Sequence, residues 1–443
     1  MCNVGGRTPF KLLVLIFSLL TAEVVTADTT PSTVTPKLRY AIVLIRHGVR
    51  SPTWARADLN AYSAEPWPDW RVAPGNLTPH GSRLMTLLGS YYRLAFAAAG
   101  LLHSTGCEDA GHVFIRADHE SRTRETGRAL VAGMMPRCNV DVHTFDGEKD
   151  PLFSPLGAGV AKADGLVAAA SISGRIGSNP NSLVETYRPA FNRLRNVLFG
   201  CIPGQRCPAE ESPGKRSLFK EPSSVKAGEG DRPADLRGPL RLGSTFSENF
   251  QLEYANGMEG KNLGWGRLDI GGLLEIMTLH AAYADLARQT LYVARLQGSN
   301  LLSHVLHSLE QAVKGERVAG SLGEAGDRIL IIVGHDTNIS NIAGMLRISW
   351  LLDGFQRDDT PPGGALVFEL WQQSGGEMTV STYFLAQSLE QMRKAIPLTL
   401  ESPPLKSAIF VPGCSAADQD MTCPWKAFQR TMESAIDPGF VKP

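Results

Sequence analysis

Two histidines occupy equivalent places in two similar sequence patterns that lie far apart in the chain. His47 follows the apolar run 41–45, and His335 follows the apolar run 329–333, each with a glycine next to it. A short continuous apolar run of this kind is typical of a β-strand that is buried on both faces. Because open α/β sheets bind ligands beyond the carboxyl ends of their parallel strands, we expect both histidines at one ligand site.

Basic residues accompany these strand ends. Arg46 and Arg50 bracket His47, and a third predicted strand, 113–117, is followed by an arginine-rich helix start that includes Arg124. Guanidinium groups offer planar pairs of donors that suit phosphate, and a helix N-terminus also favours an anion. One such pattern alone could be a solvated charged surface, but packing explains two strand-end histidines with an arginine-rich third strand poorly. The sequence therefore predicts a site that binds a phosphoryl group.

The residue types in this pattern indicate phosphoryl transfer to a histidine. Neighbouring cations lower the pKa of an imidazole, so a neutral His47 could attack phosphorus and form a phosphohistidine. Asp336, beside His335, is the natural proton donor to the leaving group and the base for the water that follows. We expect no metal and no cofactor, because the arginines neutralise the phosphate, and an acidic optimum of roughly pH 4–6.

The elements that carry these residues predict an α/β fold with a mostly parallel central sheet. The strand 41–45, a helix opened by residues 78–81 and the strand 113–117 form a βαβ pattern. Residues 366–370 and 380–384 are expected to extend the sheet as antiparallel strands.

The predicted secondary structure and the composition change along the chain, and they divide it into an α/β domain and an insertion. Residues 37–161 and 287–436 form the predicted α/β domain, and residues 162–286 form a mostly helical insertion domain. Within the insertion, residues 202–239 are rich in Pro, Gly and charge, and the sequence leaves open whether they are ordered.

Charge and the amino-terminal segment limit the location and the partners. The 443 residues carry 44 basic and 44 acidic side chains, a balance that gives no support for nucleic-acid binding. Residues 1–27 predict a signal peptide, with positive charge before the apolar run 12–20 and a cut after Ala27 favoured over Ala22. Because a membrane span needs about 20 apolar residues, we expect an exported protein, periplasmic or secreted, with no membrane association once the signal is removed.

Loss of the signal removes Cys2 and leaves six cysteines, whose placement favours three short-range disulfides. No spacing typical of a zinc site is present in the sequence, and an oxidising compartment is the simplest explanation of the cysteines. The predicted pairs are Cys107–Cys138, Cys201–Cys207 and Cys414–Cys423.

Residues 46–53 (RHGVRSPT) and 334–338 (GHDTN) together resemble the paired motifs of the histidine acid phosphatases, branch 2 of the histidine phosphatase superfamily. The resemblance runs from about Tyr40 to Ala435. Within the family, the chain resembles more narrowly the exported bacterial phytases and glucose-1-phosphatases. It implies an α/β domain and a smaller helical domain with the substrate cleft between them. Further matching segments are 77–79, 122–124, 264–266 and 360–364.

The resemblance also implies roles for individual residues. It implies that His47 is the nucleophile, His335 the second catalytic histidine and Asp336 the proton donor. The phosphate-binding positions of the family match Arg46, Arg50, Thr53 and Arg124, and Glu248 falls where the family has a residue of the helical domain that faces the substrate.

Departures from the family pattern bear on the substrate. The phytases of this branch usually carry a lysine where this chain has Trp54, and a second basic position aligns loosely with Gln297. A highly phosphorylated inositol needs several cations around it, so the choice among phytate, a sugar phosphate and a broad range of small phosphomonoesters stays open. A fourth disulfide of the family is missing, since Ala161 stands at one of its positions. The oligomeric state is also left open.

Two other classes of function compete with a phosphatase. A phosphate-ligand binding protein without turnover is disfavoured because both His47 and Asp336 are present. A transferase similar to phosphoglycerate mutase is disfavoured by the predicted export signal and the cysteines.

Overall fold

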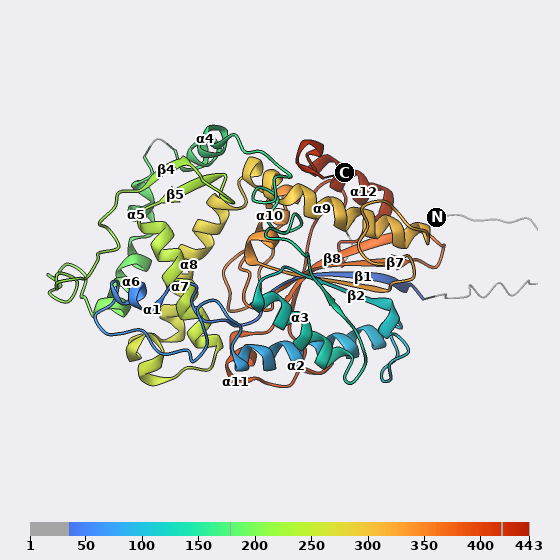
Figure 1. The fold of residues 1–443 in the computed structure, drawn as a ribbon, viewed down its shortest axis with the longest axis horizontal. Coiled ribbons are helices and arrows are strands. Elements are labelled where there is room, and N and C mark those ends of the chain that lie inside the picture. The colour runs from blue at the N-terminus through green and yellow to red at the C-terminus, as the bar shows by residue number, and fades with distance from the viewer. Residues whose placement is uncertain (1–34, 178, 418–419, 443) are drawn as a thin grey trace, which may run out of the picture. The chain divides into compact units, whose positions relative to one another are not determined.

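A computed structural model of the chain describes residues 35–177, 179–417 and 420–442 (Figure 1). The predicted signal peptide, residues 1–27, lies outside the described residues. Within them, no helix combines the length and the apolar character that a membrane crossing requires.

The described chain is built around a central eight-stranded sheet. Its strand order is β10-β8-β7-β1-β6-β2-β3, and β9 pairs with β8. Strands β1, β6, β2 and β3 run parallel, whereas the strands on the other side of β1 are antiparallel. The predicted α/β fold is confirmed, as is the antiparallel C-terminal extension. The strands are β1 (Lys37–Arg46), β2 (Val113–Ala117), β3 (Val142–His143), β6 (Ile329–Gly334), β7 (Ala365–Gln372), β8 (Met378–Ala386), β9 (Leu405–Ala408) and β10 (Cys423–Pro424).

Helices cover both faces of this sheet, which is why its central strands are apolar throughout. Residues 41–45 of β1 and 329–333 of β6 are completely buried. On one face lie α2 (Pro79–Ala98) and α3 (Ser121–Met134), and on the other lie α9 (Leu291–Lys314), α10 (Asp336–Leu346) and α12 (Trp425–Ala435) (Figure 1). Burial of these strands under two helical layers fixes their pairing, and with it the positions of the loops at their carboxyl ends.

The chain between β3 and β6 is mostly helical, although the division into two domains remains a prediction. Within residues 202–239, for which the sequence left order open, β4 (Ser224–Ala227) and β5 (Ala234–Arg237) pair as an antiparallel hairpin. The long helices α7 (Pro239–Ala255) and α8 (Ile270–Ala287) pack on each other. The other helices are α1 (Arg56–Asn60), α4 (Gly165–Ile176), α5 (Ser182–Thr186), α6 (Arg188–Phe199) and α11 (Leu389–Lys394), with short 3₁₀ turns η1 (Ala110–His112), η2 (Gly260–Asn262), η3 (Gly264–Gly266) and η4 (Pro438–Phe440).

Three disulfides join the six cysteines in the predicted pattern. Cys107 pairs with Cys138, Cys201 with Cys207, and Cys414 with Cys423. The loop that follows β1 packs against the helical part of the chain. Its Trp67 is buried and stacks on Phe250 of α7, with the ring centroids 4.9 Å apart. This contact joins the loop after β1 to α7, the helix that carries Glu248.

Candidate active site

The strand ends bring both histidines together as the sequence predicts. Arg46, the last residue of β1, lies opposite Gly334, the last residue of the parallel strand β6. The backbone N–H of His47 donates to the carbonyl of Gly334 at 3.0 Å, and the rings of His47 and His335 lie 5.6 Å apart, centroid to centroid. The sheet therefore sets the separation of the two imidazoles through its own backbone hydrogen bonds.

His47 has the protonation state that a nucleophile needs. Its Nδ1 lies 2.9 Å from the carbonyl oxygen of Gly48, which can only accept, so Nδ1 carries the proton and Nε2 keeps its lone pair. Burial holds the pKa of His47 well below its usual value, and the charges of Arg46, Arg50 and Arg122 lower that pKa further. Burial and these charges thus favour the neutral imidazole.

Gly48 allows the loop to turn close to the core beside this histidine. A Cβ atom at this position would lie 2.8 Å from Cγ of Met85 and 3.1 Å from Cδ1 of Leu77. The backbone N–H of Gly48 instead donates to the hydroxyl of Thr126 at 3.0 Å. A glycine after His47 is thus a packing requirement of this loop.

Arg46 and Arg50 share one carboxylate. Glu248 of α7 pairs with Nη2 of Arg46 through a short hydrogen bond, and with Nη2 of Arg50 at 3.1 Å. Burial opposes the ionisation of Glu248, but Arg50 and Arg46 prevail and lower its pKa to about 2. In the ligand-free site, the carboxylate of Glu248 therefore occupies the guanidinium groups that would bind a phosphate.

The third arginine whose charge reaches His47 is Arg122, whereas Arg124, the residue expected from the sequence, is exposed on α3. Residues two apart on an α-helix point about 200° away from each other, and on α3 it is Arg124 that faces solvent. Arg122 is half-buried, and its charge acts on both His47 and Arg50. Nη1 of Arg122 and Cγ2 of Thr53 both lie beside Gly75, which places Thr53 at the rim of the same site.

Three buried donors of these arginines lack partners. The Nε–H groups of Arg46, Arg50 and Arg122 have no hydrogen-bond partner among the described residues. A buried unpaired donor costs about 1–3 kcal/mol, so an anion that accepts such a hydrogen bond would be favoured. The three arginines that lower the pKa of His47 thus keep donors free for an anion.

Asp336 lies at the first position of α10, as the strand-end pattern predicts, but it is not alone. Its Oδ2 accepts from Nη1 of Arg288 at 2.6 Å. Burial opposes its ionisation, but Arg288 and Arg46 outweigh burial and hold the pKa of Asp336 well below its usual value. Asp336 is therefore ionised in the ligand-free site.

His335 is held by the carboxylate of Asp118, which was not expected from the sequence. Nε2 of His335 lies 2.6 Å from Oδ2 of Asp118, which directly follows β2. Burial raises the pKa of Asp118, but the hydrogen bond and charge of His335 outweigh that and lower it overall. The ionised carboxylate accepts the Nε2–H of His335 and fixes the orientation of its ring.

Besides Arg122, two residues of the candidate site, Asp118 and Arg288, were not expected from the sequence, for different reasons. Asp118 stands at the third strand end, where the rule that found both histidines would also have found it. Arg288 follows the C-terminal end of α8, and no local pattern marks it. Gln297, the expected second basic position, instead donates to the backbone oxygen of Asp231 at 2.8 Å.

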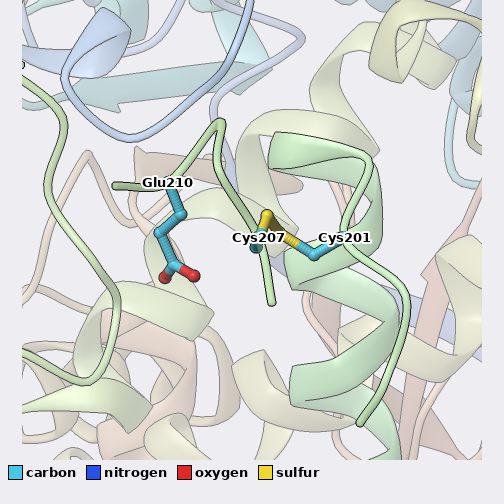
Figure 2. Close-up of side chains that lie close together, drawn as sticks. All are labelled: Cys201, Cys207 and Glu210. Atoms are coloured by element: carbon cyan, nitrogen blue, oxygen red, sulfur yellow. A yellow bond between two sulfur atoms is a disulfide. The ribbon is translucent and has the colours of Figure 1, made fainter. Parts of the chain in front are cut away.

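Among the described residues, one group of side chains has the spacing of a metal site, namely Cys201, Cys207 and Glu210 (Figure 2). The two sulfur atoms are joined in a disulfide, and Glu210 pairs with Arg195 at 2.6 Å. Since neither cysteine can supply a thiolate, this group does not fit a metal ion.

The arginine geometry yields a test with a built-in control. We expect Arg122→Gln to weaken the binding of inorganic phosphate on the order of tenfold to a hundredfold, because a charge-assisted hydrogen bond contributes about 1.5–3 kcal/mol. Arg124→Gln, which removes the same charge two residues away, should leave the affinity unchanged. Calorimetric titration at pH 5 measures both, and a larger loss for Arg124→Gln would contradict the placement of α3.

Known proteins share this fold and these motifs. The family description "Histidine phosphatase superfamily (branch 2)" matches residues 37–165 and 234–385. Phytase AppA of Escherichia coli is 34% identical over 407 residues, which cover 91% of this chain and 93% of the relative. A glucose-1-phosphatase of Salmonella typhimurium is 26% identical over 425 residues, covering 94% and 97%. The structure of Hafnia alvei phytase in complex with tartrate superposes with a TM-score of 0.84 at 33% identity, covering 93% of this chain and all of that one. The chain therefore belongs to branch 2 of the histidine phosphatase superfamily, and it is a phosphomonoester hydrolase.

Proposed function

We propose that the chain hydrolyses phosphomonoesters in two in-line steps through a phosphohistidine on His47. In the first step, the lone pair on Nε2 of His47 forms the N–P bond while the ester P–O bond breaks. The leaving alkoxide takes a proton from Asp336, and three arginines bind the oxygens of the transferring group. The observation that carries this proposal is the neutral, buried His47 next to three arginine Nε–H groups that lack partners.

The second step returns the enzyme to its starting state. Asp336 takes a proton from a water molecule, the water oxygen attacks phosphorus, and the N–P bond breaks with its electron pair returning to His47. Inorganic phosphate then takes this proton from Asp336 and leaves as its monoanion, so that Asp336 is ionised again. Asp118 holds His335 as the second imidazole beside the reacting phosphorus.

Binding would exchange one anion for another. Glu248 is the counter-ion of Arg46 and Arg50 in the ligand-free site, and the substrate phosphate takes over this role. The two guanidinium groups thus remain paired before and after binding, so the site avoids the cost of burying unpaired cations. Glu248 is then free to contact the rest of the substrate, in keeping with its predicted position facing the substrate.

The proton for the leaving group enters with the substrate. Asp336 is ionised in the ligand-free site, whereas a phosphate monoester keeps one proton below its second pKa near 6. The negative charge of the bound ester also offsets Arg46 and Arg288, which raises the pKa of Asp336 and lets it hold that proton. This account supports the acidic optimum of roughly pH 4–6 and gives it a different cause from the ordinary pKa of an aspartate.

Export of the mature chain is part of the proposal. Three disulfides, together with the predicted signal peptide, support an oxidising compartment such as the periplasm or the exterior. We also propose that residues 162–286 form the helical insertion domain, which would contribute Glu248 to the site. The partner is a small-molecule phosphate ester.

The role of Asp336 can be separated from that of His47 with two leaving groups. In Asp336→Asn, 4-nitrophenyl phosphate should still phosphorylate His47, because nitrophenolate leaves without a proton. The phosphoenzyme should then hydrolyse slowly, with steady-state turnover reduced about 10²- to 10⁴-fold. Rapid-quench measurement should therefore show a burst of one equivalent of nitrophenol.

Two controls complete this test. Glycerol 2-phosphate, whose alkoxide needs a proton, should give no burst with Asp336→Asn, and His47→Ala should give none with either ester. A burst that persists in His47→Ala would exclude His47 as the nucleophile.

The ion pair between Arg288 and Asp336 predicts a shift in the pH profile. Arg288 lowers the pKa of Asp336, so Arg288→Gln raises that pKa and keeps the acid protonated to higher pH. The alkaline limb of kcat for glycerol 2-phosphate should therefore move upward in pH, with an increase in KM. Arg124→Gln is the control for loss of one positive charge. A limb that stays in place or moves downward in Arg288→Gln would contradict the assignment of the acid.

A further inference from the structure

One carboxylate at the candidate site is shared by two histidines. Oδ2 of Asp118 lies 2.6 Å from Nε2 of His335, and its Oδ1 lies 2.9 Å from Nδ1 of His119, the next residue in the chain. The backbone N–H of His119 also donates to Oδ1 at 2.7 Å. The proposed reaction uses His335 and Asp118 but gives His119 no part.

These three side chains form a row from the solvent to the site. The side chain of His119 is 35% exposed, whereas that of Asp118 is buried and that of His335 has its ring 5.6 Å from the ring of His47. The ionised carboxylate of Asp118 can only accept, so Nδ1 of His119 carries a proton and donates to it. His119 therefore holds the carboxylate oxygen that His335 leaves free.

Asp118 depends on these two imidazoles for its charge balance. Within the described residues, they are its only ion-pair partners. The cations nearby in the chain have carboxylates of their own, since Arg116 binds Asp150 at 2.6 Å and Arg122 binds Glu120 at 3.0 Å. The charges of Asp118 and Asp150 also repel each other. Because a buried carboxylate without a cation is costly, each imidazole that can carry charge favours its ionised form.

The backbone fixes the position of Asp118 but not the plane of its carboxylate. The N–H of Asp118 donates to the carbonyl of Val333 in β6 at 3.0 Å, which holds the main chain at the end of β2. The terminal torsion of an aspartate side chain has no sharp preference, so hydrogen bonds at both oxygens are needed to set the plane. The plane in turn sets the direction from which the Nε2–H of His335 is accepted.

We propose that His119 is a positioning residue of the phosphatase reaction: it holds Oδ1 of Asp118, and the carboxylate fixed in this way orients His335 beside the reacting phosphorus. The inference rests on the proposed phosphohistidine mechanism and adds to it a group that acts through Asp118. A second effect is electrostatic. Burial raises the pKa of Asp118, but the hydrogen bonds and charges of His335 and His119 outweigh burial and keep the carboxylate ionised in acid.

Two substitutions separate the hydrogen bond of His119 from its charge. His119→Leu removes both, whereas His119→Asn removes the charge and keeps an N–H at nearly the place of Nδ1. At pH 6, kcat for glycerol 2-phosphate should fall about three- to tenfold in His119→Leu, while KM is retained because the arginines still bind the phosphate. His119→Asn should restore kcat to within about twofold of the parent value.

The pH profile reports the effect of the charge. Loss of the charge of His119 raises the pKa of Asp118, so the carboxylate takes up a proton at a higher pH and no longer holds His335. The acidic limb of kcat should therefore move upward in pH in both His119→Leu and His119→Asn. A limb that stays in place in both variants, or a loss of kcat in His119→Asn equal to that in His119→Leu, would overturn the proposal.

A matched control lies at the other end of β2. His103 has its Nδ1 3.1 Å from the carboxylate of the buried Asp109, and its backbone N–H donates to that carboxylate at 2.7 Å. His103→Leu therefore removes the same kind of contact, but from a carboxylate that precedes β2 instead of following it. This control should leave kcat, KM and the acidic limb unchanged, and changes equal to those of His119→Leu would contradict the role of His119.

A measurement without turnover separates this inference from the proposed reaction. With nitrogen-15 in the histidine rings, NMR can follow the exchange of the Nε2–H of His335 with water. This exchange should be about three- to tenfold faster in His119→Leu than in the parent chain, and unchanged in His119→Asn and His103→Leu. If the parent chain released no phosphate, the proposed reaction would fail while this measurement still tested His119. Equal exchange rates in the parent and His119→Leu would rule out the positioning role.

Discussion

The site depends on the balance of charge around a buried imidazole. Burial and the nearby guanidinium groups both disfavour the protonated form of His47, so the same cations that bind phosphate keep the nucleophile ready. Such cations cannot be buried alone, and in the ligand-free site two carboxylates balance them: Glu248 on α7 and Asp336 on α10. In the proposed reaction, substrate binding exchanges these counter-ions. This exchange also explains how an aspartate that is ionised in the free site can hold a proton once a phosphate has entered.

The sheet supplies the precision that this chemistry requires. His47 and Asp118 follow strands β1 and β2, which both pair with β6, and their backbone N–H groups donate to Gly334 and Val333 at 3.0 Å each. The catalytic groups therefore move with the most deeply buried strands of the fold rather than with a flexible loop. Burial of apolar strands under two layers of helices stabilises the fold and sets the catalytic geometry at once.

Sequence patterns predicted those parts of the site that a strand end determines. A buried strand has a fixed direction and a fixed end, so His47, His335 and Asp336 could be placed from their position after an apolar run. The side of a helix on which a residue falls depends on where the helix starts, and Arg124 was expected in place of Arg122 for this reason. Arg288 enters the site through the packing of α8 and α10, and this packing leaves no local signal in the sequence.

The central claim is that phosphorus passes through a covalent bond to His47, and the stereochemistry at phosphorus tests it most directly. The enzyme would transfer an isotopically chiral phosphoryl group from an aryl ester to an acceptor alcohol, and the configuration of the product would be determined by phosphorus NMR. Each in-line displacement inverts the configuration, so two successive displacements through a phosphohistidine give overall retention. Overall inversion would show a single direct displacement and would contradict the assignment of His47 as nucleophile.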